Sequence, residues 1–293
     1  MLGKRDMSVE LSDLLFNALN EQGYLFREAC GQALENKEGT TGWEVKASEY
    51  PVSLQGQDTR VDIVLRSKTS SSPELYALVE CKRADPTYIY WVFGAPGLPF
   101  GDALCSTFGL ECRETRSDRP YQASRLVARL HFTLSTYCAE SWLEARKGSD
   151  RRTSTPQNIE NAFGQVLKGV GGLAQEQLDQ RHKGRELFKT FFVPVVVTTA
   201  SLYVAYYETR NVDLSTGRIG KEKVLFGPQG QPAEEVEWVL VDYGVGENVA
   251  PKPIPESYHG VDPAELRKYK TRSIFVVNSK SLVSFFSKLH LAQ

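Results

Sequence analysis

The sequence predicts a mixed α/β fold in which helices flank both faces of a central sheet. Three observations predict it: a helical pattern near the N-terminus, three strand-like runs after it, and a later helix followed by apolar strands. The chain has 293 residues, 41% hydrophobic and 24% charged, which excludes collagen-like, disordered and disulfide-scaffold proteins. The length permits one elaborated domain or two small ones, and we expect one domain over 1–293.

The first helical pattern covers residues 10–36. Its apolar face has helical spacing and consists of Leu11, Leu14, Leu15, Ala18 and Leu19. Gly23 interrupts the pattern, so we expect two helical pieces. Three strands should follow, at 43–50, 60–66 and 75–82, because each run is rich in β-branched or aromatic residues and ends at turn residues.

The pattern beyond Lys82 is less regular. Residues 84–110 are rich in Pro, Gly and aromatic residues and predict irregular structure, whereas 121–146 and 156–178 predict helices. In the second helix, Gly169-x-Gly171-Gly172 predicts a break. Further strands are expected at 191–199, 202–208, 217–226, 236–242 and 273–278, before a final helix that ends near Leu289.

Features of the sequence favour a cytoplasmic protein with no membrane partner. The N-terminus has no long apolar stretch or cleavage-site pattern, and the most apolar segment, 191–207, contains a proline and hydroxyl residues that suit buried strands. The five cysteines form no CxxC pair, and the four histidines are scattered, which excludes a zinc cluster. We therefore expect reduced thiols, and oxygen ligands for any metal.

The chemistry-bearing residues lie in two of the predicted strands. Asp62 interrupts the apolar run Val61-Asp62-Ile63-Val64-Leu65, and Glu80 and Lys82 end the next strand. Residues two apart on a strand project from the same face, so Glu80 and Lys82 should lie together. If the two strands pair through the turn at 67–73, Asp62 lies beside Glu80.

Two carboxylates held together repel each other, and a divalent cation relieves that repulsion. Asp62, Glu80 and the backbone carbonyl of Cys81 would supply the oxygen ligands that Mg²⁺ prefers, while Lys82 orients a water for attack on a phosphodiester. The alternative is a structural ion pair between Lys82 and Glu80. We favour the metal site because an unmatched charge in an apolar strand is costly.

In the order and spacing of Asp62 and Glu80-Cys81-Lys82, the chain resembles the PD-(D/E)xK nuclease superfamily. The resemblance implies a restriction-endonuclease-like core (αβββαβ) over 10–82 and 156–208, with a large insertion at 84–154 that binds substrate and a β-rich C-terminal extension at 209–293. It also implies that Asp62 and Glu80 bind Mg²⁺, for which Mn²⁺ substitutes, and that Lys82 is catalytic. Val61 stands where many members have proline.

The resemblance assigns roles to two further residues. Glu28 matches a glutamate that many members carry on the first helix as a metal ligand; the alternative is a solvated helix carboxylate. Gln165 corresponds to a glutamine that some relatives place on the helix after the catalytic strand, where it contacts nucleic acid. The tyrosine found four residues later in those relatives is replaced here by Gly169.

The formal net charge of −1 hides an uneven distribution. Residues 113–152 hold nine basic and five acidic residues, and residues 1–60 hold six basic and ten acidic ones. Arg116, Arg119 and Arg125 in the basic segment are candidates for phosphate contact. The alternative is a solvated face.

We therefore expect a Mg²⁺-dependent endonuclease that hydrolyses DNA in restriction or antiviral defence. Cleavage of both strands favours a homodimer, and a defence system would supply a partner subunit. The alternatives are a catalytically silent DNA-binding or assembly subunit, and a nuclease acting on repair intermediates or RNA. The sequence has no phosphate-binding GxxxxGK[ST] loop, no GxSxG elbow and no GxGxxG after a strand.

Overall fold

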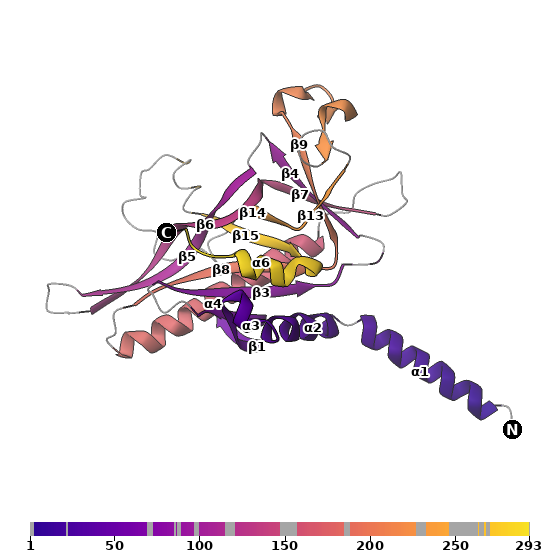
Figure 1. The fold of residues 1–293 in the computed structure, drawn as a ribbon, viewed down its shortest axis with the longest axis horizontal. Coiled ribbons are helices and arrows are strands. Elements are labelled where there is room, and N and C mark those ends of the chain that lie inside the picture. The colour runs from indigo at the N-terminus through magenta and orange to yellow at the C-terminus, as the bar shows by residue number, and fades with distance from the viewer. Residues whose placement is uncertain are drawn as a thin grey trace.

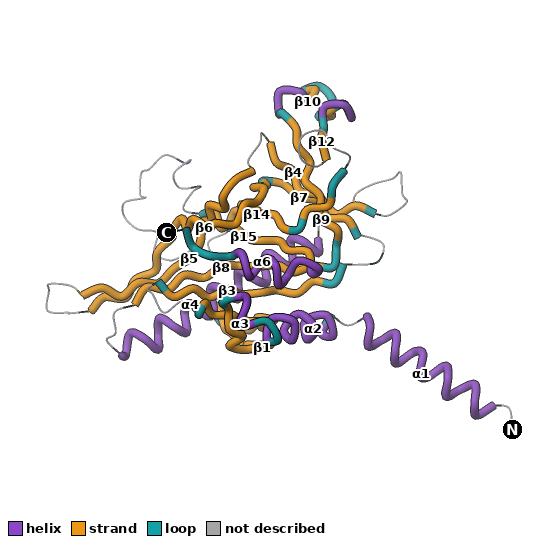
Figure 2. The backbone as a smooth tube through the Cα atoms, viewed as in Figure 1, coloured by secondary structure: helices purple, strands orange, loops and turns teal. Residues whose placement is uncertain are grey.

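The structure is a computed structural model of a mixed α/β protein in which strands predominate (Figures 1 and 2). It describes residues 3–21, 23–68, 73–84, 86, 89–96, 100–114, 121–146, 157–184, 188–226, 233–245, 263, 267 and 270–292. Most of the strands belong to one eight-stranded sheet with the order β1-β2-β3-β8-β15-β14-β6-β5.

The first three strands form the antiparallel meander that the sequence predicts. They are β1 (Trp43–Leu54), β2 (Gln57–Ser67) and β3 (Glu74–Lys82). Helix α4 (Gln157–Gly184) precedes β8 (Phe188–Thr198), which pairs with β3 in parallel along its whole length. The predicted helix, three strands, helix and strand are therefore all present. Their strands are neighbours in the sheet, since β1 pairs with β2, β2 with β3, and β3 with β8.

The remaining strands of this sheet are β5 (Phe100–Glu114), β6 (Tyr121–Ala139), β14 (Trp238–Gly244) and β15 (Thr271–Asn278). The first half of β8 pairs with β5 and its second half with β15. Because β15, β14, β6 and β5 are themselves neighbours in that order, these pairings close a five-stranded barrel through β8. The barrel is not part of the fold that the sequence predicts.

The predicted irregular structure at 84–110 and the predicted helix at 121–146 are wrong, because most of the described residues in these ranges form strands. Residues 90–96 and 100–114 are β4 and β5, and 121–145 contains β6 and β7 (Ser141–Ala145). Within β6, Leu130, Phe132 and Leu134 are buried and the residues between them are exposed. Burial with a period of two stabilises a strand, although leucine, alanine and arginine favour helices.

A second sheet has the order β12-β9-β4-β7, with β13 also paired to β9. Its strands are β4 (Tyr90–Pro96), β7, β9 (Ser201–Tyr207), β12 (Leu225–Phe226) and β13 (Glu235–Val236). The expected strand at 217–226 is reduced to β12 and to β11 (Arg218–Ile219), which pairs with β10 (Val212–Asp213). This sheet and its short hairpin lie at one end of the molecule (Figure 1).

The predicted insertion and the predicted extension both contribute strands to the main sheet. Strands β5 and β6 come from the predicted insertion, and β14 and β15 come from the predicted extension. β15 lies directly between β8 and β14, inside the sheet. Both segments are therefore structural parts of the same sheet as β3.

The N-terminal helices separate at Gly23, as the sequence predicts, into α1 (Gly3–Glu21) and α2 (Tyr24–Glu35). Short helices α3 (Glu38–Thr41) and α6 (Leu282–Lys288) lie near α2. Helix α1 extends away from the rest of the molecule (Figure 1), and the side chains of Leu11, Leu14 and Leu15 are 57–62% exposed. No helix in the described part of the chain is long and apolar enough to cross a membrane.

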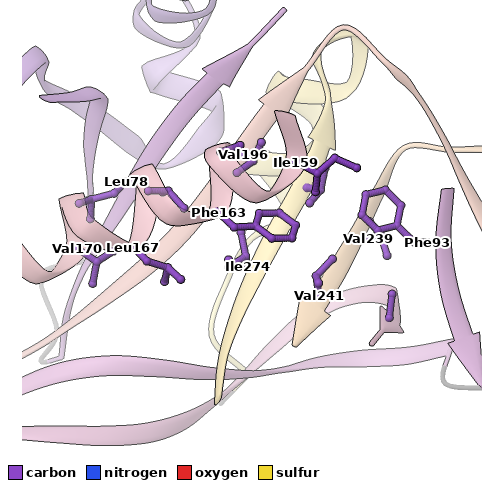
Figure 3. Packing of buried hydrophobic residues seen from close by; sticks show 14 of the residues in the cluster. Leu78, Phe93, Ile159, Phe163, Leu167, Val170, Val196, Val239, Val241 and Ile274 are labelled. Carbon is purple, nitrogen blue, oxygen red and sulfur yellow. The ribbon is translucent and has the colours of Figure 1, made fainter. Parts of the chain in front are cut away.

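The sheet is buried on both faces around β3. On one face, Phe163, Leu167 and Val170 of α4 pack with Leu78 and Val196 (Figure 3). On the other face, residues of α2 and α6 pack against alternate residues of β3 and β8, among them Cys30, Leu34, Phe285, Phe286, Val79, Cys81 and Val193. Burial on both faces holds the end of β3 in a fixed position.

The glycines of α4 allow the helix to approach the sheet closely and do not break it. The helix is continuous from 157 to 184, so the predicted break is wrong. A Cβ at Gly169 would lie 2.7 Å from Val61 Cγ2, and one at Gly172 would lie 2.7 Å from Val52 Cβ. No larger residue fits this contact without displacing β1 or β2.

Candidate active site

The candidate site lies where β2 and β3 stop pairing. Their ladder ends at the pair Ile63 and Val79, and continuing the same register sets Asp62 opposite Glu80. Along β3, Ala77, Val79 and Cys81 face the α2 side, so Glu80 and Lys82 project toward α4. The two predicted acids and the lysine therefore meet at one end of the sheet.

Beyond the last backbone pair of β2 and β3, the side chain of Asp62 connects the two strands. The backbone N–H of Cys81 donates a 2.8 Å hydrogen bond to Asp62 Oδ2, and Arg27 Nη1 lies 3.9 Å from Oδ1. Burial raises the pKa of Asp62, while the Cys81 hydrogen bond and the Arg27 charge oppose that rise. The carboxylate is thus held on both oxygens.

Glu80 is the most strongly perturbed acid of the site. Its side chain is only 7% exposed, and Lys82 Nζ lies 2.9 Å from its Oε1. Burial and, second, the charge of Asp62 raise the pKa of Glu80 to about 7, despite the neighbouring ammonium. The carboxylate pair therefore carries a repulsion that Lys82 alone does not cancel.

Gln165 lies beside Lys82. It projects from α4, and its Oε1 accepts a 2.5 Å hydrogen bond from Lys82 Nζ. Lys82 thus bridges Glu80 on the sheet and Gln165 on the helix. An open hollow of about 370 Å³ adjoins this bridge and is lined by Lys82, Asn158, Glu160, Asn161, Gly164, Gln165 and Lys168.

Glu28 does not reach the carboxylate pair directly. Its side chain is 64% exposed and accepts a 3.2 Å hydrogen bond from Arg27 Nη2. Arg27 also forms a 2.6 Å ion pair with Glu49. Glu28 is therefore connected to Asp62 through the guanidinium of Arg27, an arrangement that fits an exposed helix carboxylate.

Arg27 and Glu49 are members of this network that the sequence reasoning missed. Glu49 lies opposite Asp62 in the β1–β2 register and has a positive φ of 49°. Counting back from the turn at Gln55-Gly56 would have paired residue 49 with residue 62. Arg27 gave no comparable signal, because its contact depends on how α2 packs on the sheet.

Of the three predicted basic contacts, the structure describes Arg125, which lies far from this site. Arg116 and Arg119 lie outside the described residues. Arg125 pairs with Leu110, which lies opposite Thr190, the residue that pairs with Glu74 at the beginning of β3. Glu80 is six residues further along β3, about 20 Å at the usual rise of a strand.

The donor set suits a magnesium ion bound by few protein ligands. Within the described ranges, no three His, Cys, Asp or Glu side chains gather closely enough to hold a metal. Mg²⁺, however, keeps several waters and usually binds one or two carboxylates together with substrate phosphates. Asp62 and Glu80 supply two carboxylates, and the Cys81 carbonyl faces the same strand edge as its N–H. Burial, first, and the charge of Asp62, second, raise the pKa of Glu80, and a cation bound there would oppose both effects.

The chain matches no protein-family model, no curated protein and no solved structure. Its function is therefore argued from the geometry of Asp62, Glu80 and Lys82. All five cysteines are free thiols.

Proposed function

We propose that this protein is a Mg²⁺-dependent deoxyribonuclease of the PD-(D/E)xK type, with Mn²⁺ as a substitute ion. The observation that carries the proposal is the register that sets Asp62 opposite Glu80, with Lys82 Nζ 2.9 Å from the glutamate. The order α2-β1-β2-β3-α4-β8, with β8 parallel to β3, supports a restriction-endonuclease-like core. Strands β5, β6, β14 and β15, which close the barrel with β8, and the second sheet would be additions to that core.

Asp62, Glu80 and the Cys81 carbonyl would hold the ion, which supplies charge neutralisation at the phosphate and a more acidic water. Cys81 N–H and Arg27 keep the Asp62 carboxylate oriented. Lys82, fixed between Glu80 and Gln165, would donate a hydrogen bond from its Nζ to the attacking water and so orient it. The buried face of β3 limits movement of all three residues.

A second function remains open because one observation favours it. Lys82 pairs with Glu80, and Cys81 N–H satisfies Asp62, so the three residues also have partners without a metal. The same geometry would suit a DNA-binding or assembly subunit without turnover. Nucleases for repair intermediates or RNA would use the same residues.

The experiment is a cleavage assay with purified protein on supercoiled, linear and single-stranded DNA and on RNA, in Mg²⁺, Mn²⁺ or EDTA. We expect divalent-ion-dependent cleavage of DNA that Asp62→Ala and Lys82→Ala abolish, and that the exposed control Glu140→Gln retains. DNA binding without cleavage in either ion would support the silent subunit instead. Cleavage by Asp62→Ala at the wild-type rate would contradict both the assignment of Asp62 to the active site and its role as a metal ligand.

The cellular setting is proposed on the same basis. Free thiols are in keeping with a reducing, cytoplasmic compartment. One site cuts one strand, so double-strand cleavage would use a homodimer. A role in restriction or phage defence, with or without a partner subunit, follows from the resemblance.

A further inference from the structure

The hollow beside Lys82 has a lining rich in hydrogen-bond donors. Asn161, Gln165 and Lys168 are exposed and follow each other at helical spacing along one face of α4. From Asn161 to Lys168 the helix rises about 10 Å. Gly164 lies between them, and no atom lies within 4 Å of the position its Cβ would take, so the middle of this face is open.

The acidic residue of the lining does not oppose an anion directly. Both oxygens of Glu160 accept 3.0 Å hydrogen bonds, Oε1 from Trp142 Nε1 and Oε2 from Tyr243 Oη. These partners lie on β7 of the second sheet and β14 of the barrel, so the carboxylate is turned toward these two strands. The groups left for a ligand are the ammonium of Lys168 and the side-chain amides.

The contact with Lys82 fixes how Gln165 presents its amide. Because Gln165 Oε1 accepts from Lys82 Nζ, the amide NH₂ group is left to donate to a ligand. Lys82 therefore lies between the candidate active site and the hollow, because its ammonium contacts Glu80 on one side and Gln165 on the other. A ligand in the hollow would lie directly next to one bound at Asp62 and Glu80.

We propose that Asn161, Gln165 and Lys168 form a phosphate subsite that holds the backbone of a single DNA strand, next to the phosphate at Asp62 and Glu80. Amide and ammonium donors without a free carboxylate match a phosphodiester monoanion. The three donor side chains extend over about 10 Å of α4, which is more than the axial rise of one DNA strand per nucleotide, about 3.4 Å. The subsite rests on the proposed nuclease function, and it sets the direction in which the strand leaves the site, along α4.

The test measures binding of a fluorescein-labelled single-stranded DNA by anisotropy, in EDTA, over a series of NaCl concentrations. Lys168→Gln should make the slope of log K against log salt shallower by about 0.7, which is about a fivefold loss at 0.1 M salt. Lys168→Arg should retain the wild-type slope. Lys221→Gln, a change at an exposed lysine in the short 3-10 helix between β11 and β12, is the matched control and should bind like wild type. Thermal melting checks that each variant is folded.

The outcomes separate this proposal from the nuclease function. Wild-type affinity and slope in folded Lys168→Gln, or no binding by the wild type, overturn the subsite. Equal losses in Lys168→Gln and Lys221→Gln also overturn it, because they indicate nonspecific charge. If the slope changes as expected but no DNA is cleaved in Mg²⁺ or Mn²⁺, the subsite stands and the nuclease function fails.

Discussion

The N–H of Cys81 and the carboxylate of Asp62 form a 2.8 Å hydrogen bond just past the last backbone pair of β2 and β3. A side chain thus satisfies a donor that the ladder leaves free. The bond orients one oxygen of Asp62 and leaves its remaining lone pairs for a ligand. Asp62 therefore has a structural and a chemical role, and two variants separate them.

Asp62→Asn should reduce cleavage by about a hundredfold or more, because an amide loses the charge that a metal requires, worth about 3 kcal/mol in the transition state. It should change the free energy of unfolding little, since the Asn carbonyl still accepts from Cys81. Asp62→Ala should lose both activity and about 1–3 kcal/mol of stability, because the N–H is then unsatisfied. Urea unfolding and a plasmid assay measure the two effects. Equal stability of the two variants would argue against the structural role.

The raised pKa of Glu80 predicts an unusual pH dependence of stability. In EDTA the folded protein keeps a proton on Glu80 up to about pH 7, whereas the unfolded chain releases it near 4.5. Because the folded state binds more protons in that window, the free energy of unfolding should fall as pH rises through it, by at most about 3 kcal/mol. Urea titrations of wild type and Glu80→Gln measure this; the variant should lack the fall.

Adding Mg²⁺ should restore the stability that the protein loses in EDTA as the pH rises. Above pH 7 Glu80 is ionised and free to bind the cation, whereas below pH 7 the cation must displace a proton. The rise in melting temperature on adding Mg²⁺ should therefore be larger at pH 8 than at pH 6. Glu80→Gln should show little rise at either pH. A Mg²⁺ effect that is equal at both pH values would place the ion elsewhere.

Glu144 predicts a stability effect at the start of α4. Its buried carboxylate accepts from the backbone N–H groups of Asn158 and Ile159 and from Asn158 Nδ2. Glu144→Ala should lower the free energy of unfolding by about 2 kcal/mol or more, because a helix cap is lost and its donors are left buried. Glu140→Gln changes a neighbouring exposed acid and should stay within about 0.5 kcal/mol of wild type in the same urea titration. Similar losses of stability in both variants would contradict the capping role of Glu144.

Two glycines of one helix should respond in opposite directions to alanine. At Gly172 a Cβ would lie 2.7 Å from Val52 Cβ, so Gly172→Ala should destabilise the protein by about 1–3 kcal/mol. At Gly164 nothing lies within 4 Å, and alanine should stabilise the helix by up to about 1 kcal/mol. Chemical denaturation of both variants checks the sign. Stabilisation by Gly172→Ala would mean that α4 lies further from β1.

The meander, α4 and β8 could be predicted because each is specified by local patterns. Asp62 and Glu80 could be matched because one antiparallel register relates them. Strand β6 could not be predicted, since its leucines, alanines and arginines favour helix, and its pairing with β5 and β14 makes it a strand. The contact of Arg27 with Glu49 and Asp62 depends on tertiary packing, which leaves no spacing to recognise.

The place of β15 between β8 and β14 bears on how the protein is made. Residues 271–278 must pair with β8 before the strand next to β3 has its full set of neighbours. A chain emerging from the ribosome has made Asp62, Glu80 and Lys82 long before it can complete this barrel. If the protein cuts DNA, nascent chains would not cleave it until residue 278 has been translated. Premature stop codons would then yield products without nuclease activity.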